Sequence, residues 1–514
     1  MRDLEHMEER LAALADVEAD DTSLALAWIA TEGGGDDEED AEILRSNDGL
    51  IRRFDRLTGM WCVLDKTDTL QRVSEFLCEV GDAKLEAVEA RFRQGEIEKK
   101  DRLAAKKLYA NLRSTTRRTA VWQTAVVNMD AAEVDDFDAN PELLGTPGGV
   151  IDLRTGEVRS ATVGDKVTQS TDVAPAQAGA SASRWLEFLS QVFEGDKETL
   201  EFIERLVGSA LVGNVSAQKF FVLYGRGSNG KSVLRDVVSC LVGSYAGTAS
   251  AKVFMQSHSD RHPTEIASLA GKRVVMASEV PAGRSWNDAL LKELTGGEKM
   301  TTRWVHQNEF SFTPRGTLIF TANTLPSFTG AQEAMLRRIV IIEFKRNFTE
   351  DEQDPNLVAD LISTEGSAIL RWAIDGARKF LADGGGVRGL RIPQSITDAT
   401  RTYFEEEDIV LQFLIDAQGS AATSIDWSPG AFVSCSQLFD EFRRWAESKG
   451  HKSWSVRTLS KVIRENAERY ELSDVRTKAA RGFRVERRLT EPPTGANSKF
   501  AKHVAIKRRR AVKK

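Results

Sequence analysis

The sequence contains few of the residues that build disulfide frameworks or zinc sites. Its 514 residues include only four cysteines and six histidines. The cysteines lie far apart at positions 62, 78, 240 and 435, and the histidines form no cluster. Neither a disulfide framework nor a paired zinc-ligand spacing is present. A reducing, cytoplasmic environment is therefore expected, and a zinc-ribbon module is excluded.

Long apolar runs are also missing. No segment approaches 18 consecutive apolar residues, and residues 1–21 are acidic where a secretion signal is basic and then apolar. We therefore expect no export and no membrane partner. No repeat of 20 to 50 residues indicates a solenoid. With 41% hydrophobic and 29% charged residues, the chain is expected to form two to four domains.

Charge is distributed unevenly along the chain. The net charge is −7, yet residues 1–42 hold fifteen acidic residues and two arginines, whereas residues 499–514 hold eight Lys or Arg and no acidic residue. A basic tail favours nucleic acid as a partner, although such tails are also solvated ends without a specific ligand.

A glycine-rich segment matches the pattern G-x-x-x-x-G-K-[ST] at every fixed position. An apolar run at 220–224 predicts a strand before it, and Val233, Leu234, Val237 and Val238 predict a helix after it. Glycines let backbone amides approach phosphate, and a helix N-terminus favours anions. The segment predicts a nucleotide site in which the lysine contacts phosphates and the serine ligates Mg²⁺, and by itself it suits a kinase or a GTPase equally. Its residues are Gly225, Arg226, Gly227, Ser228, Asn229, Gly230, Lys231 and Ser232.

Two later strands end in polar residues that suit the same site. The apolar run 274–277 ends at Glu279, which we expect to orient metal-bound water, act as base, or both. The run 318–320 leads to Asn323, whose amide suits contact with the γ-phosphate and the attacking water. Arg337 and Arg338 precede another apolar run, and either suits the role of an arginine finger.

A β-hairpin is predicted between these strands, with arms at 299–305 and 309–313. Lys299, Arg303 and His306 are placed to contact DNA phosphates. Trp304 suits either stacking on a base or packing on the core, and core packing is the favoured interpretation.

The carboxy-terminal region predicts a winged helix. Helices are expected at 434–448 and 456–467, followed by a hairpin around the glycine at 482. In the second helix Val456, Leu459 and Ile463 are predicted to face the core. Arg457, Lys461 and Arg464 are then left to contact the DNA backbone.

Five ordered motifs resemble the superfamily-3 helicases, and more closely the phage and plasmid primase-helicase family related to the poxvirus-type helicase. They are GRGSNGKS, LAGKRVVMASEV, LTGGEKMTTRWV, FTPRGTLIFTANTLPSF and EAMLRRIVIIEF, between residues 225 and 344. FDANPELLGTPGGVIDLRTGEV at 137–158 and YFEEEDIVLQFL at 403–414 are similar to flanking signatures of that family.

The resemblance implies an α/β fold: an AAA+-like P-loop ATPase with a central parallel sheet, a mixed amino-terminal domain and a small winged-helix domain. The expected parts are an acidic segment (1–44), a mixed domain (45–180), the ATPase core (181–350), helices completing it (351–425), the winged helix (426–490) and a basic tail (491–514).

The activity that the resemblance implies is ATP- and Mg²⁺-dependent movement of a homo-hexamer, 3′ to 5′, on single-stranded and forked DNA, with other replication proteins as partners. Two alternatives remain open. One is a primase-helicase, for which we find no zinc spacing and no convincing pair of catalytic aspartates. The other is an origin-binding initiator that uses ATP only to control assembly.

Overall fold

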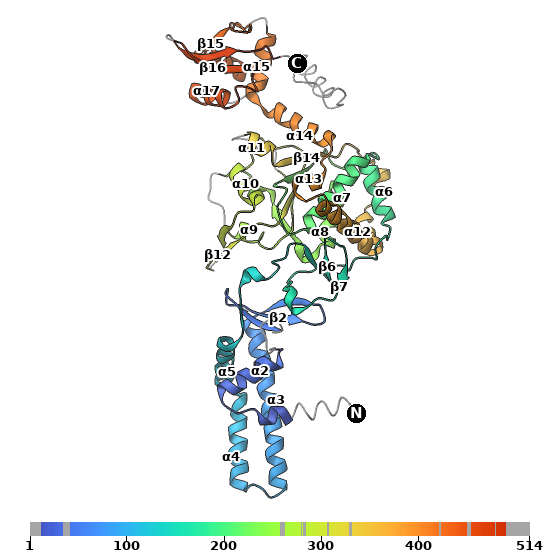
Figure 1. The fold of residues 1–514 in the computed structure, drawn as a ribbon, viewed down its shortest axis with the longest axis vertical. Helices are drawn as coiled ribbons and strands as arrows, with labels where there is room; N and C mark the ends of the chain where they lie inside the picture. The colour runs from blue at the N-terminus through green and yellow to red at the C-terminus, as the bar shows by residue number, and fades with distance from the viewer. Residues whose placement is uncertain are drawn as a thin grey trace.

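The structure is a computed structural model. It describes residues 12–33, 42–257, 263–278, 280, 284–305, 308–327, 332–420, 423–449, 454–477 and 480–489. Figure 1 shows an elongated molecule in which amino-terminal helices, a central sheet domain and a carboxy-terminal domain follow one another along the long axis.

The amino-terminal part combines helices with a small sheet. Its helices pack around a core that includes Trp28, Val73, Leu77 and Val121. They are α2 (Asp21–Thr31), α3 (Lys66–Arg93), α4 (Lys99–Ala110) and α5 (Thr115–Asn128). The sheet has the order β3-β2-β1-β4, formed by β1 (Ile43–Ser46), β2 (Ile51–Asp55), β3 (Met60–Leu64) and β4 (Ala131–Ala132).

Three short antiparallel strands connect this part to the central domain. They are β5 (Leu143–Thr146), β6 (Gly149–Asp152) and β7 (Val158–Arg159). Gly149 has a φ of 115°, and a Cβ there would collide with the carbonyl of Arg159. The turn before β6 therefore requires glycine at this position.

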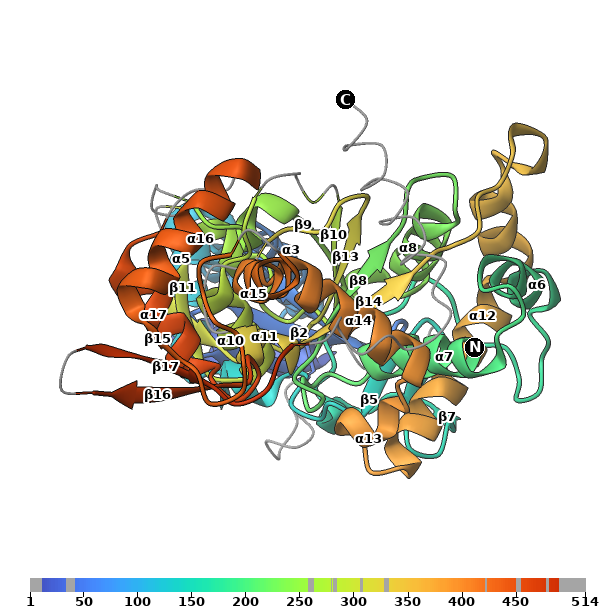
Figure 2. The ribbon, with the colours of Figure 1, turned by 90° about the horizontal axis from the view of Figure 1, so that it is seen from above.

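The central domain is built on a five-stranded sheet with the order β14-β8-β13-β10-β9, and every pairing is parallel. Figure 2 shows the strands side by side in this order. Their bounds are β8 (Phe220–Tyr224), β9 (Ala246–Ser250), β10 (Val274–Ser278), β13 (Thr317–Ala322) and β14 (Ile339–Glu343). The expected central parallel sheet is confirmed, and all five carboxyl ends share one edge.

Helices cover both faces of this sheet. Alternate strand residues point to opposite faces, so Phe221 and Ile319 join one core whereas Phe220 and Phe320 join another. The first core packs under α6 (Ser183–Val192), α7 (Lys197–Leu211), α8 (Lys231–Leu241) and α12 (Leu357–Ala382). The second lies against α9 (Pro263–Ala267), α10 (Asp288–Gly296) and α14 (Gln394–Glu407). Two short helices, α11 (Gln332–Leu336) and α13 (Gly386–Leu390), complete the domain.

A hairpin stands between α10 and β13. Its strands are β11 (Met300–Arg303) and β12 (Glu309–Phe312), which pair antiparallel from Met300↔Phe312 to Arg303↔Glu309. Trp304 is 38% exposed and stacks on Phe310 with ring centroids 6.5 Å apart. The prediction that Trp304 packs in the core is therefore wrong, because the indole continues the hairpin beyond the last strand pair.

The carboxy-terminal domain runs helix, strand, helix, helix, strand, strand. These are α15 (Ile409–Gly419), β15 (Phe432–Ser434), α16 (Cys435–Lys449), α17 (Val456–Glu465), β16 (Leu472–Arg476) and β17 (Arg481–Val485). The sheet order is β15-β17-β16. Leu459 and Ile463 are buried as predicted, but Val456 is 39% exposed because it begins α17 at the edge of the core. Buried residues of α15 join this core, before the expected boundary at 426.

No helix within the described ranges is long and apolar enough to cross a membrane.

Candidate nucleotide site

The glycine-rich loop lies where β8 ends and α8 begins. Gly227 and Gly230 adopt positive φ angles of 104° and 87°, which glycine adopts without strain. Ser228 also has a positive φ, at 46°. No side chain caps the N-terminus of α8, so its first amides remain available to an anion. The loop therefore has the backbone geometry of an anion-binding turn.

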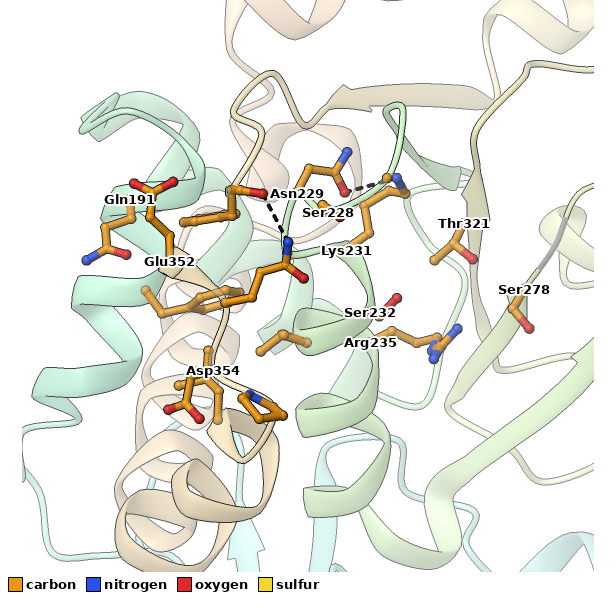
Figure 3. Close-up of a pocket in the computed structure, with 18 of the residues that line it drawn as sticks. Gln191, Ser228, Asn229, Lys231, Ser232, Arg235, Ser278, Thr321, Glu352 and Asp354 are labelled. Atoms are coloured by element: carbon orange, nitrogen blue, oxygen red, sulfur yellow. Dashed lines mark hydrogen bonds between the residues drawn. The ribbon is translucent and has the colours of Figure 1, made fainter. Parts of the chain in front are cut away.

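A cavity of about 1220 Å³ opens beside this loop. The loop residues 227–232 line it, together with Ser278 at the end of β10 and Thr321 and Asn323 at the end of β13. Because β13 lies between β8 and β10, the sheet order brings these polar side chains to one edge. Figure 3 shows Thr321 and Ser278 on one side of the loop and Gln191, Glu352 and Asp354 on the other.

The loop lysine is already oriented by the loop itself. Lys231 is 6% exposed, and its Nζ donates to the carbonyl of Gly225 over 2.7 Å and to Asn229 Oδ1 over 3.0 Å. Burial lowers the pKa of Lys231 below its ordinary value of 10.5. Burial deprives the charged ammonium of stabilisation by water. An anionic ligand in the cavity stabilises that charge instead.

Not every predicted site residue lines the cavity. Gly225 is buried and Arg226 is exposed, and neither of them lines the cavity. Glu279 falls outside the described residues, although Ser278 beside it lines the cavity. The hydroxyl-bearing Ser232 is in place for a metal ligand.

Arg337 and Arg338 lie outside their own chain's cavity, between α11 and β14. Arg337 is exposed, whereas Arg338 is half-buried and its Nη1 donates to the carbonyl of Ala334 over 3.2 Å.

Several cavity residues escaped prediction. Lys252 follows β9, and Arg235 lies on α8. Phe188 and Gln191 of α6 also line the cavity, as do Phe348 and Glu352. The strand-like segment before Lys252 has the sequence AGTAS and carries no apolar signal. The position of Lys252 in the cavity depends on the parallel pairing of β9 with β10, which no sequence pattern predicted.

The residues predicted to contact DNA differ in the ion pairs that they make within the protein and in their exposure. Lys299 pairs with Asp135 over 3.3 Å, and exposed Arg303 lies opposite Glu309 on the hairpin. His306 falls outside the described residues. In the carboxy-terminal domain Arg457 is exposed, Lys461 lies 3.7 Å from Glu465, and Arg464 lies 3.7 Å from Asp474.

Comparison with known proteins finds two family models that match parts of this chain. The fold and site define a mixed α/β protein with a glycine-rich loop at the carboxyl edge of a parallel sheet. Residues 41–194 match the family described as D5 N terminal like, and residues 223–338 match a family of unknown function. These matches and the viral relatives support a D5-like primase-helicase family for this chain.

Viral proteins are among its curated relatives. Protein L207/L206 of Acanthamoeba polyphaga mimivirus, which carries a helicase name, is 25% identical over 245 residues, covering 47% of this chain and 25% of that protein. Helicase-named V13 of Sputnik virophage is 29% identical over 151 residues, covering 28% and 19%. Primase D5 of Fowlpox virus is 26% identical over 162 residues, covering 30% and 20%. The matches thus cover about a fifth to a quarter of these three relatives.

Among solved structures, the apo A form of the NrS-1 C terminal region aligns at a TM-score of 0.49 and 12% identity, covering 91% of this chain and all of that one.

Proposed function

We propose that this chain is an ATP-driven DNA helicase of a replication system. The observation that carries the proposal is the cavity at the carboxyl edge of the sheet, where an uncapped helix N-terminus, a buried lysine and the ends of β10 and β13 converge. The helicase and primase names of its relatives support a role in DNA replication.

The residues of the cavity suit a Mg²⁺–nucleoside triphosphate. Loop amides and Lys231 bind the phosphates, and the Ser232 hydroxyl holds the metal. A bound Mg²⁺ would supply positive charge that stabilises the negative charge developing on the phosphates. Glu279 orients or deprotonates the attacking water, and Asn323 contacts the γ-phosphate from the end of β13. An AAA+-like P-loop core follows from this set of roles.

The position of the arginine pair supports a ring. We assign the finger to Arg337, because it is exposed whereas Arg338 is half-buried. A neighbouring subunit then completes each site, which fits the hexamer implied by the superfamily-3 resemblance.

Two surfaces are proposed for DNA. The hairpin of β11 and β12 presents Arg303 and Trp304 to single-stranded DNA inside the ring. The element order of the carboxy-terminal domain supports a winged helix that places α17 against the duplex of a fork. We propose 3′ to 5′ translocation from the resemblance alone.

A primase-helicase is the second candidate, because Primase D5 of Fowlpox virus is among the relatives and residues 41–194 match the D5 N terminal like family. Primer synthesis on a single-stranded template, from ribonucleotides or deoxynucleotides, would distinguish it.

The ATPase assay tests the first proposal. Wild-type protein is expected to hydrolyse ATP faster when single-stranded DNA is added, whereas Lys231→Ala is expected to show no hydrolysis above background. Equal hydrolysis by the two proteins would contradict the proposed site.

A further inference from the structure

The side-chain amide of Asn229 lies between the loop lysine and the end of β14. Asn229 is 3% exposed. Its Oδ1 accepts from Lys231 Nζ over 3.0 Å, and its Nδ2 donates to the carbonyl of Phe344 over 3.3 Å. Figure 3 marks the bond between Asn229 and Lys231. This amide therefore has both of its functional groups engaged inside the protein.

The orientation of the amide is fixed by its surroundings. A carbonyl can only accept, so the NH₂ group must face Phe344 and the oxygen must face the ammonium. The opposite orientation would set an NH₂ group against Lys231. Gly225 permits this arrangement, because a Cβ there would collide with Asn229 Nδ2 and with the Phe344 carbonyl. The Phe344 amide in turn donates to the Tyr224 carbonyl over 2.7 Å. The residue that accepts from Asn229 is therefore itself held against the end of β8.

The ammonium of Lys231 has three hydrogens and two fixed acceptors. Gly225 and Asn229 take two of the hydrogens. Among the described residues no carboxylate pairs with this lysine, and its side chain lines the cavity. The third hydrogen is thus available to a ligand in the cavity. The positions of the two acceptors set the direction of that third N–H bond.

We propose that Asn229 is a positioning residue that aims Lys231 at the second and third phosphates of a nucleotide, so that the site selects nucleotides by phosphate number. The inference rests on the proposed function as an ATP site. Without the Asn229 oxygen, one acceptor remains and the ammonium must be ordered by the ligand itself, at the expense of affinity.

Nucleotide affinity measured on the full chain tests this role. Asn229→Ala is expected to weaken binding of ADP and of a non-hydrolysable ATP analogue about tenfold, the effect of losing one charge-assisted hydrogen bond, and to leave AMP affinity unchanged. AMP lacks the phosphates that Lys231 contacts. A general collapse of the loop would weaken all three ligands together.

Asn347→Ala is the matched control. With its amide turned to donate, Asn347 lies 3.1 Å from the Ser228 carbonyl and 3.2 Å from that of Gly227, so it holds the same loop without touching Lys231. Its affinities are expected to stay within about twofold of wild type, as for the loss of a neutral, partly exposed hydrogen bond. Equal losses in the two variants would overturn the positioning role.

A second variant keeps the shape of the side chain. Asn229→Asp places a carboxylate against the ammonium, where it competes with phosphate, and is expected to weaken the ATP analogue more than Asn229→Ala does. Wild-type affinity in either Asn229 variant, with wild-type protein binding ATP normally, would overturn the inference and leave the proposed function standing. A wild-type protein that binds none of the three nucleotides would contradict both.

Discussion

The ammonium of Lys219 donates a hydrogen bond to the backbone carbonyl of Arg337 over 2.6 Å. The next residue makes a second link, since the amide of Phe220 bonds to the Arg338 carbonyl over 2.8 Å. Burial, followed by the charge of Arg338, lowers the pKa of Lys219. The start of the strand that ends in the phosphate-binding loop is thereby joined to the arginine pair proposed to serve a neighbouring site.

Replacing Lys219 by Met tests this link. The side chain keeps its apolar length but loses the bond to Arg337, so the arginine is held less firmly. We expect DNA-stimulated ATP hydrolysis to fall about tenfold while ATP affinity is unchanged.

The control for Lys219→Met is Lys272→Met. Lys272 also donates to a carbonyl over 2.7 Å, that of Ser244, and burial also lowers its pKa, but it lies just before β10, away from Arg337 in the sequence. Similar losses in hydrolysis from both variants would show a general effect on the sheet instead of a role for Arg337.

Lys252 is expected to contribute to ATP affinity. It lines the cavity just after β9, whose last residue pairs with Ser278 of β10, and its positive charge suits contact with a phosphate. Lys252→Ala is expected to raise the KM for ATP several-fold, as for the loss of one charge-assisted contact. Exposed Lys197, which begins α7 and does not line the cavity, gives the control Lys197→Ala. An unchanged KM in Lys252→Ala would remove it from the site.

The exposed indole of Trp304 is expected to stack on a DNA base. Trp304→Ala should weaken binding of a single-stranded oligonucleotide by about 1–3 kcal/mol, the range measured for loss of one base–aromatic contact. Phe432, exposed to a similar 39% in the carboxy-terminal domain, provides the control Phe432→Ala. Fluorescence anisotropy at a fixed salt concentration compares the two, and equal affinities for wild type and Trp304→Ala would refute the contact.

A buried carboxylate makes the stability of the carboxy-terminal domain depend on pH. Asp408 is 1% exposed and accepts from the Tyr470 hydroxyl at both oxygens over 3.0 Å. Burial raises the pKa of Asp408 above 3.8, although the Leu411 amide, Arg469 and Tyr470 each lower it. Because the folded protein holds this proton more tightly than the unfolded chain, the group's contribution to stability is present below pH 3.8. It is lost as the pH rises through the folded pKa.

Tyr470→Phe removes a donor that stabilises the charged form of Asp408. We expect the free energy of unfolding to fall by about 1–3 kcal/mol near pH 8, where Asp408 carries more negative charge than at low pH and has lost one of its donors. The loss should be smaller near pH 4.5, where Asp408 is closer to neutral. Denaturant titrations at the two pH values measure both quantities, and a loss independent of pH would contradict this explanation.

The strands with apolar sequences could be predicted from the chain alone. The run FFVLY coincides with β8, because a strand buried on both faces needs no other signal. Strand β9 has the sequence AGTAS and owes its conformation to pairing with β10, so neither it nor Lys252 was predicted. The contact of Asn229 with the Phe344 carbonyl depends on where the chain leaves β14, 115 residues further on, which no local pattern encodes.

The misplaced side chains have a different cause. Val456 was predicted to face the core from helical spacing, and core packing was the favoured interpretation for the apolar Trp304, yet both side chains are exposed. Each lies at the end of its element, where the neighbouring element no longer covers it.

Strand separation tests the central claim most directly. A forked DNA with a labelled strand is incubated with Mg²⁺–ATP and either wild-type protein or Lys231→Ala, and the released strand is measured over time. We predict release by wild type, dependent on a 3′ single-stranded tail, and none by Lys231→Ala. Equal release by the two proteins, or no release by a wild-type protein that hydrolyses ATP in response to DNA, would contradict an ATP-driven helicase.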